Sequence, residues 1–383
     1  MNRSFVTAGI TSIAGLVLIA ASPTGNKHDG QFIFRYDTFG DEQLWTDVLR
    51  MHEVVQAAVT PRIALSVGLK VDSEALPPRF LERANLDSTA TTVELLRRNA
   101  VVGLRAKVED GKIQTLGITC ALCHSTVDDS VTAGVGKRLD GWANLHLNPG
   151  AIIALSPAVP PAQKAYYASW GPGKYDPRFS IDGKTTGPVV IPPAYGLQGV
   201  SFETFTGDGP VSYWNNYVAV TQMGGQGHFS DPRLGINVAQ DPDLVVPKLP
   251  ALLAYQLSLA APPPPAGSFD AAAAARGQAV FASAGCSSCH IAPTYTDVQN
   301  GPDPATPLLH EAAETGTEPI YATRSATKKY RTTPLRALWQ HAPYFHDGSA
   351  TTLEQVVTRY ELQGGFVLPP AQKADLVEFL KSL

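Results

Sequence analysis

The chain has 383 residues, of which 44% are hydrophobic and 17% are charged, and its formal net charge is −4 at pH 7. This length allows two domains, and the composition is ordinary for a soluble globular protein. No run of basic residues is present, so the sequence argues against a nucleic-acid partner.

Residues 1–25 have the pattern of a secretory signal. Arg3 supplies a positive start, and an apolar stretch follows from Phe5 to Ala21. Pro23 lies where it would hinder cleavage, so an uncleaved N-terminal anchor remains open as the alternative. We therefore expect export to the periplasm, with membrane contact only if this segment is retained.

Two helices are expected ahead of the first cysteine. Apolar residues recur at helical spacing over residues 41–59, which Pro61 should end, and over residues 91–104. A short turn is expected at Asp110-Gly111. Residues 130–250 are rich in Gly and Pro and are expected to form mostly ordered loop, which is long for structureless chain.

A polyproline stretch at residues 261–265 predicts a stiff linker and a domain boundary. We expect an N-terminal domain over residues 26–261, a Pro-rich linker over 262–268 and a C-terminal domain over 269–383.

Three helices are expected in the C-terminal domain. The first is Ala-rich and covers residues 270–284, and the last covers residues 371–381. Thr351 and Glu354 have the spacing of a capping box, which predicts that the third begins there.

All four cysteines of the chain belong to two copies of Cys-x-x-Cys-His. The two motifs consist of Cys120, Cys123 and His124, and of Cys286, Cys289 and His290. This is the attachment signature of c-type haem, in which both thiols join the haem and the histidine binds iron. A zinc site would need two distant pairs to converge, and a redox dithiol would not need the histidine. We therefore expect two covalently bound haem c groups.

The helix before the second motif and the helix at the chain end are typical of a small cytochrome c module. The predicted fold class is therefore mainly α, with two cytochrome-c-like haem domains and long ordered loops around them.

The sixth ligand of each iron decides between electron transfer and chemistry at the iron. No methionine follows the linker, so a second haem cannot take a methionine from its own domain. Candidates there are His310, His341, His346 and Tyr360. For the first haem the candidates are Met51, His52, His146, Met223 and His228. Tyr360 falls on the apolar face of its helix, where a core tyrosine is the alternative interpretation.

The C-terminal half resembles the di-haem cytochrome c peroxidase family and its relative, the methylamine dehydrogenase maturation enzyme. The matching elements are Thr-Pro-Leu-Arg at 333–336, Ala-Pro-Tyr-Phe-His-Asp-Gly at 342–348 and Thr-Leu-Glu at 352–354. The N-terminal half matches loosely, at 192–197 and 205–209. The resemblance implies that the two haem motifs face each other across an interface between modules.

The resemblance also implies roles for single residues. Tyr360 matches a methionine ligand of the peroxidases and a tyrosine ligand of the maturation branch. Gln222, before the candidate ligand Met223, stands where the family places a glutamate near the reactive haem, and Glu203 is the expected substitute if the fold brings it near.

Further roles concern the haem edge and the path between the haems. Arg336 is expected to pair with a haem propionate, and His346 to lie at the haem edge or to serve a structural turn. Trp214 and Trp339 are either electron relays or core aromatic residues.

The leading hypothesis is an exported di-haem oxidoreductase that reduces hydrogen peroxide or a related oxidant with electrons from a small redox protein. The alternative is a di-haem electron carrier without catalysis. A haem-based sensing module is a third interpretation.

Overall fold

The computed structural model describes residues 26–177 and 187–383, so the expected signal segment lies outside the described residues. Helices predominate in this part of the chain, in agreement with a mainly α class, and its five sheets each have two strands. No helix of the described residues is long and apolar enough to cross a membrane.

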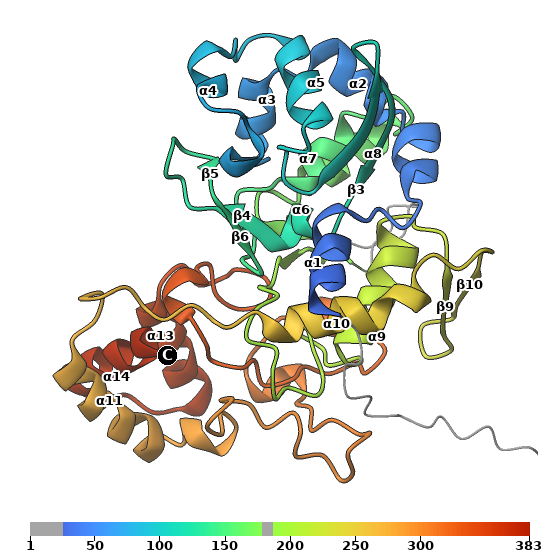
Figure 1. The fold of residues 1–383 in the computed structure, drawn as a ribbon. Coiled ribbons are helices and arrows are strands. Elements are labelled where there is room, and N and C mark those ends of the chain that lie inside the picture. Colours follow the sequence, from blue (N-terminus) through green and yellow to red (C-terminus); the bar gives the residue numbers. More distant parts are fainter. Residues whose placement is uncertain (1–25, 178–186) are drawn as a thin grey trace, which may run out of the picture.

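Residues 43–175 form most of the upper part of Figure 1. The helices there are η1 (Gln43–Val48), α2 (Met51–Ala58), α3 (Pro61–Ser66), η2 (Ser73–Ala75), α4 (Phe80–Arg83), α5 (Thr89–Arg97), α6 (Ala121–His124), α7 (Pro149–Ala154) and α8 (Pro161–Ala168). The strands are β1 (Val71–Asp72), β2 (Leu104–Glu109), β3 (Lys112–Ile118), β4 (Ser125–Val127), β5 (Val135–Gly136), β6 (Arg138–Asp140) and β7 (Lys174–Tyr175).

The middle of the molecule packs the first helix of the described chain against later ones (Figure 1). Its helices are α1 (Lys27–Tyr36), α9 (Val211–Tyr217), the π-helical η3 (Val218–Gln222), η4 (Val246–Lys248) and α10 (Leu249–Ser258). Strand β8 (Val189–Val190) pairs with β7, and β9 (His228–Asp231) forms a hairpin with β10 (Ile236–Ala239).

The C-terminal part lies at the lower left of Figure 1. Its elements are α11 (Ala271–Ser283), η5 (Cys286–Ser288), η6 (Ala312–Glu314), α12 (Ile320–Thr323), η7 (Leu338–Gln340), α13 (Leu353–Gly364) and α14 (Pro370–Ser382). The predictions of a helix at 270–284 and of one at 371–381 are confirmed. The helix expected near Thr351 is capped one residue later, because Thr352 accepts the capping hydrogen bond from the Gln355 N–H at 3.3 Å.

The helices expected ahead of the first motif are only partly correct. The helix over residues 41–59 is broken into η1 and α2 at Arg50, whose φ of +55° interrupts the helical hydrogen bonds. Pro61 begins α3, because a proline at the first helical position loses no helical hydrogen bond. The helix over 91–104 ends at Arg97, since Leu104 begins a hairpin. Asp110 and Gly111 form its two-residue turn, both at positive φ.

Residues 130–250 lie mostly outside helices and strands where the structure describes them, as predicted. Besides β9 and β10, this stretch contains α7, α8, and α9 continuing into η3. These helices are short, so each has too few turns for a helical repeat of apolar residues to be recognised in the sequence.

Each cysteine motif lies against its own part of the hydrophobic core. Leu122 is buried in a cluster with the α2, α5 and β3 side chains, and Ala121 in a second cluster with α9 and α10. Cys286 packs against a third cluster, formed by α11, α13 and α14. The motifs are therefore held by the core and not by flexible loops.

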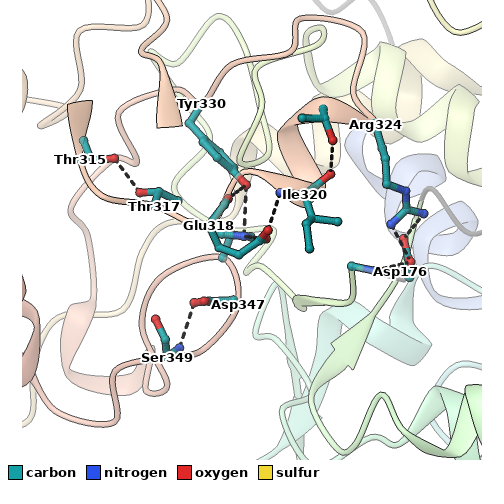
Figure 2. A network of polar contacts seen from close by, with 12 residues as sticks. Asp176, Thr315, Thr317, Glu318, Ile320, Arg324, Tyr330, Asp347 and Ser349 are labelled. Carbon is teal, nitrogen blue, oxygen red and sulfur yellow. Dashed lines mark hydrogen bonds and ion pairs between the residues drawn. The ribbon is translucent and has the colours of Figure 1, made fainter. Parts of the chain in front are cut away.

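Among the contacts that join the C-terminal segment to earlier chain, two lie beside β7 and β8. Asp176, next to β7, accepts two hydrogen bonds from Arg324 after α12, at 2.9 and 3.0 Å (Figure 2). Beside this pair, Val189 packs in a buried cluster with Tyr321 and Tyr330. The pair is buried, so it fixes this junction more firmly than a surface ion pair would.

Candidate functional site

The first motif presents a neutral histidine with one nitrogen free. His124 ends α6, and its Nδ1 lies 3.0 Å from the carbonyl oxygen of Pro192. Because a carbonyl only accepts, Nδ1 carries the proton and Nε2 keeps its lone pair. Burial lowers the pKa of His124 to about 4, so the ring is neutral near pH 7. A neutral imidazole fixed in this way is the usual form of a metal ligand.

The second motif repeats this arrangement on a different scaffold. Helix α11 ends at Ser283, and Gly285 at φ +80° turns the chain into η5. The Nδ1 of His290 lies 2.9 Å from the carbonyl oxygen of Tyr295, and the backbone of Thr333 also interacts with the ring. Burial lowers the pKa of His290 as well.

The four cysteines are unpaired thiols. Burial raises the pKa of Cys120 and of Cys123 to about 12, and it also raises the pKa values of Cys286 and Cys289. Zinc binding and thiol–disulfide exchange both use the thiolate, the form that burial disfavours at these four cysteines. They remain suited to covalent attachment of a cofactor.

One cavity of about 640 Å³ connects the two motifs. His124 lines it from one side, and Cys286, Cys289 and His290 line it from the other. Cys120 and Cys123 do not line this cavity, so the expectation that the two motifs face each other stays a prediction. Around the second motif the cavity brings Cys286, Cys289 and His290 together among mostly apolar side chains, so the residues present there fit covalently bound haem.

Tyr360 lines the same cavity from α13. The residue is 37% exposed, and burial of its phenol raises the pKa of Tyr360 to about 12. Among the described residues its hydroxyl has no hydrogen-bond partner, although its ring packs at 6.3 Å from Phe345. Its role as the sixth ligand opposite His290 stays a prediction.

The three histidines that competed with Tyr360 each have a partner for a ring nitrogen. His310 contacts Asp297 at 3.0 Å and Glu314 at 2.9 Å, one carboxylate at each ring nitrogen. His341 contacts the Tyr195 hydroxyl at 3.0 Å. His346 is stacked among aromatic rings, with Nε2 at 3.1 Å from the Tyr330 hydroxyl and Nδ1 buried.

None of the candidates for the sixth ligand of the first haem lines the cavity. Met51 and Met223 are buried in the two core clusters that hold the first motif. The Nδ1 of His146 lies 3.2 Å from the Lys70 amine, and His228 contacts Asp241 at the surface. The Nδ1 of His52 is buried without a partner. Met223 as a metal ligand therefore stays a prediction that the cavity does not favour.

Gln222 and Glu203 lie in different surroundings. Gln222 accepts a hydrogen bond from the Tyr175 hydroxyl at 2.9 Å, and Tyr175 is close enough to Cys123 for their charges to interact. Glu203 lines the cavity, where its carboxylate lies 3.0 Å from Arg331 and 3.9 Å from Arg336. Only Glu203 is thus placed at the shared cavity, and both catalytic roles stay predictions.

Sequence analysis missed Arg331 and Trp142. Arg331 lies in the segment that carried the resemblance, but only the fold brings Glu203 to it. Trp142 packs edge-to-face against Trp339, with ring centroids 5.7 Å apart. Trp214 instead donates to the Glu203 carbonyl oxygen at 3.0 Å from within the core.

Comparisons with known proteins give limited likenesses. No protein-family model matches the chain. The cytochrome-c peroxidase IdrP2 of Pseudomonas sp. (strain SCT) is 32% identical over 143 residues, covering 29% of this chain and 39% of that protein. The chain therefore spans well under half the length of this relative.

Two solved structures show weaker likenesses. Hydrazine synthase of Kuenenia stuttgartiensis has a TM-score of 0.33 at 20% identity, covering 53% of this chain and 78% of that one. A MauG-like protein associated with microbial copper homeostasis has a TM-score of 0.28 at 22% identity, covering 35% of this chain and 55% of that one. Scores of this size do not define a shared fold.

Proposed function

We propose that this chain is an exported c-type cytochrome with two covalent haems that reduces hydrogen peroxide or a related oxidant. The observation that supports this most is the single cavity of about 640 Å³ lined by the histidines of both motifs. A pure carrier needs each haem edge near the surface, whereas a shared cavity gives an oxidant and an internal electron donor one common site.

Each half of the chain has its own task in this proposal. Cys120, Cys123 and His124 hold one haem, and Cys286, Cys289 and His290 hold the other. Bound haem supplies one-electron redox steps and an iron that can bind the oxidant. The protein orients both histidines through backbone carbonyls and lines much of the cavity with apolar side chains.

The two sixth positions are expected to differ. Tyr360 offers an unpartnered phenol at the cavity, and an anionic oxygen ligand favours ferric iron. The methionines and histidines proposed for the first haem have other surroundings, which favours an open site there. Peroxide reduction consumes two electrons and two protons for two water molecules, and the electrons would come from a small redox protein.

A ferric electron paramagnetic resonance spectrum at low temperature tests the proposal. We expect a high-spin signal from one haem and steady turnover with hydrogen peroxide in the presence of a reduced small cytochrome. Two low-spin signals with no peroxide turnover would favour the electron carrier instead.

A further inference from the structure

Arg331, Arg336 and Glu203 form a charge cluster at the wall of the cavity, and this cluster is not neutral. The side chains are 7%, 16% and 8% exposed, respectively. Two guanidinium groups face one carboxylate, so the cluster carries one excess positive charge. Burial lowers the pKa values of both arginines, and Glu203 is the carboxylate that offsets this for each of them.

A buried excess charge is costly unless an ion of opposite sign accompanies it. Arginine keeps its proton even when buried, so the cluster cannot become neutral by losing one. The remaining way to balance the charge is an anion bound beside the two guanidinium groups. The buried Nε of Arg331 and Oε1 of Glu203 also lack hydrogen-bond partners, which shows that the cluster is incomplete.

The backbone holds Glu203 in this place from several sides. Its N–H donates to the Gly209 carbonyl at 2.9 Å, and its carbonyl accepts from the Trp214 indole at 3.0 Å. The next residue, Thr204, has a φ of +60°, which is strained for a side chain branched at Cβ. Strain that is retained around a buried carboxylate indicates a built site.

The same loop binds the arginine segment. Arg331 donates from its guanidinium to the Phe202 carbonyl at 2.6 Å and from its backbone N–H to the Phe205 carbonyl at 2.9 Å. The guanidinium of Arg336 donates to the Gly196 carbonyl. The cluster therefore joins chain from both sides of the proline-rich segment, at the cavity that both motifs line.

We propose that Arg331 and Arg336 together form a carboxylate-binding seat that takes a haem propionate, with Glu203 as the fixed counter-charge that the two arginines share. A planar guanidinium can give two parallel hydrogen bonds to a carboxylate, so each arginine can serve Glu203 and a propionate at once. Glu203 then sets the charge felt by the haem and does not act on the oxidant. The inference rests on the two-haem proposal and not on peroxidase activity.

Reduction potentials of the holoprotein, measured by spectroelectrochemistry, test the carboxylate-binding seat, because two substitutions should shift the potential of one haem in opposite directions. Arg331→Gln removes a positive charge near one haem, which favours its ferric form. We expect the ratio of reduced to oxidised haem at a fixed potential to fall about tenfold, which is about 59 mV for one electron. Glu203→Gln should raise the potential of the same haem, and Arg331→Lys should keep most of the wild-type value.

Arg276→Gln is the matched control, because Arg276 of α11 forms an ion pair with Asp375 of α14 outside the charge cluster. It should leave both potentials unchanged. All variants should keep two covalent haems, since the thioether bonds do not depend on the cluster. A loss of haem from the wild-type protein would refute the two-haem proposal, whereas unchanged potentials in both Arg331→Gln and Glu203→Gln would refute the seat alone.

Two further measurements identify the anion. The propionate bending modes in the resonance Raman spectrum should shift in Arg331→Gln and not in Arg276→Gln. Acetate, added at constant ionic strength, should leave the wild-type ferric spectrum unchanged because the seat is already filled. An acetate-dependent spectrum in the wild type that Arg331→Gln abolishes would show a site for free anions and overturn the assignment.

Discussion

The crossing of α11 and α14 depends on the absence of a side chain at Gly277. A Cβ built there would overlap the carbonyl oxygen of Asp375 and come within 2.9 Å of the Phe379 side chain. Neither helix can relieve this by a rotamer change, because the obstructing atom belongs to the backbone. The helices must separate, and the contact between the Phe281 and Phe379 rings, at 5.2 Å, would weaken.

Two effects of Gly277→Ala oppose each other, and their sizes decide the outcome. Alanine is the better helix former by about 1 kcal/mol. Overpacking a closely packed site costs about 1–3 kcal/mol, and an immobile backbone oxygen places this case at about 3 kcal/mol. We therefore expect a net loss of about 2 kcal/mol in the free energy of unfolding.

Denaturant unfolding of the holoprotein, followed by circular dichroism, measures this loss. Gln278→Ala is the control, because Gln278 is the exposed neighbour in the same helix and should change stability by less than about 0.5 kcal/mol. Because α11 leads directly into Cys286, we also expect the absorption of the second haem to change. A Gly277→Ala protein as stable as the wild type would refute the packing argument.

Three other predictions concern the site and its surroundings. Replacing Cys286 and Cys289 by alanine should lower the haem content from two to one per chain in a pyridine haemochrome assay, and full content would contradict the assignment. Tyr360→Phe should shift the ferric spectrum and raise the potential of the second haem, because the phenolate favours ferric iron; an unchanged spectrum would exclude ligation. Asp41→Asn should stabilise the protein by more than about 1 kcal/mol near pH 7, since burial raises the pKa of Asp41 to about 9. The contribution of Asp41 to stability is full below its unfolded pKa of 3.8 and is lost as pH rises toward 9, so the advantage of Asp41→Asn should grow over that range and should be absent near pH 3.

The parts of the fold that sequence predicted well are those with a local physical signal. The helix over Ala271–Ser283 has an Asp270 cap and alanines throughout, and the helix over Pro370–Ser382 begins at a proline. Both signals act within a few residues. The break at Arg50 has no such signal, because an arginine takes a positive φ only when surrounding packing requires it.

The site residues likewise divide into those with a local sequence signal and those that only the fold brings together. The haem motifs are local, so their six residues could be named from spacing alone. The partners of Glu203 are not local: Arg331 is 128 positions away, and the loop that carries Glu203 is shaped by Gly209 and Trp214. Sequence reasoning therefore proposed Glu203 as an acid–base group and could not see that two arginines hold it.

The surroundings of Glu203 bear on whether it can act as a general acid. A general acid must be able to reach the substrate, whereas the Glu203 carboxylate lies 3.0 Å from Arg331 and 3.9 Å from Arg336. Glu203 is better placed to balance charge than to deliver protons. A proton donor for peroxide reduction would then have to come from a group at the cavity that is neutral and has a free proton.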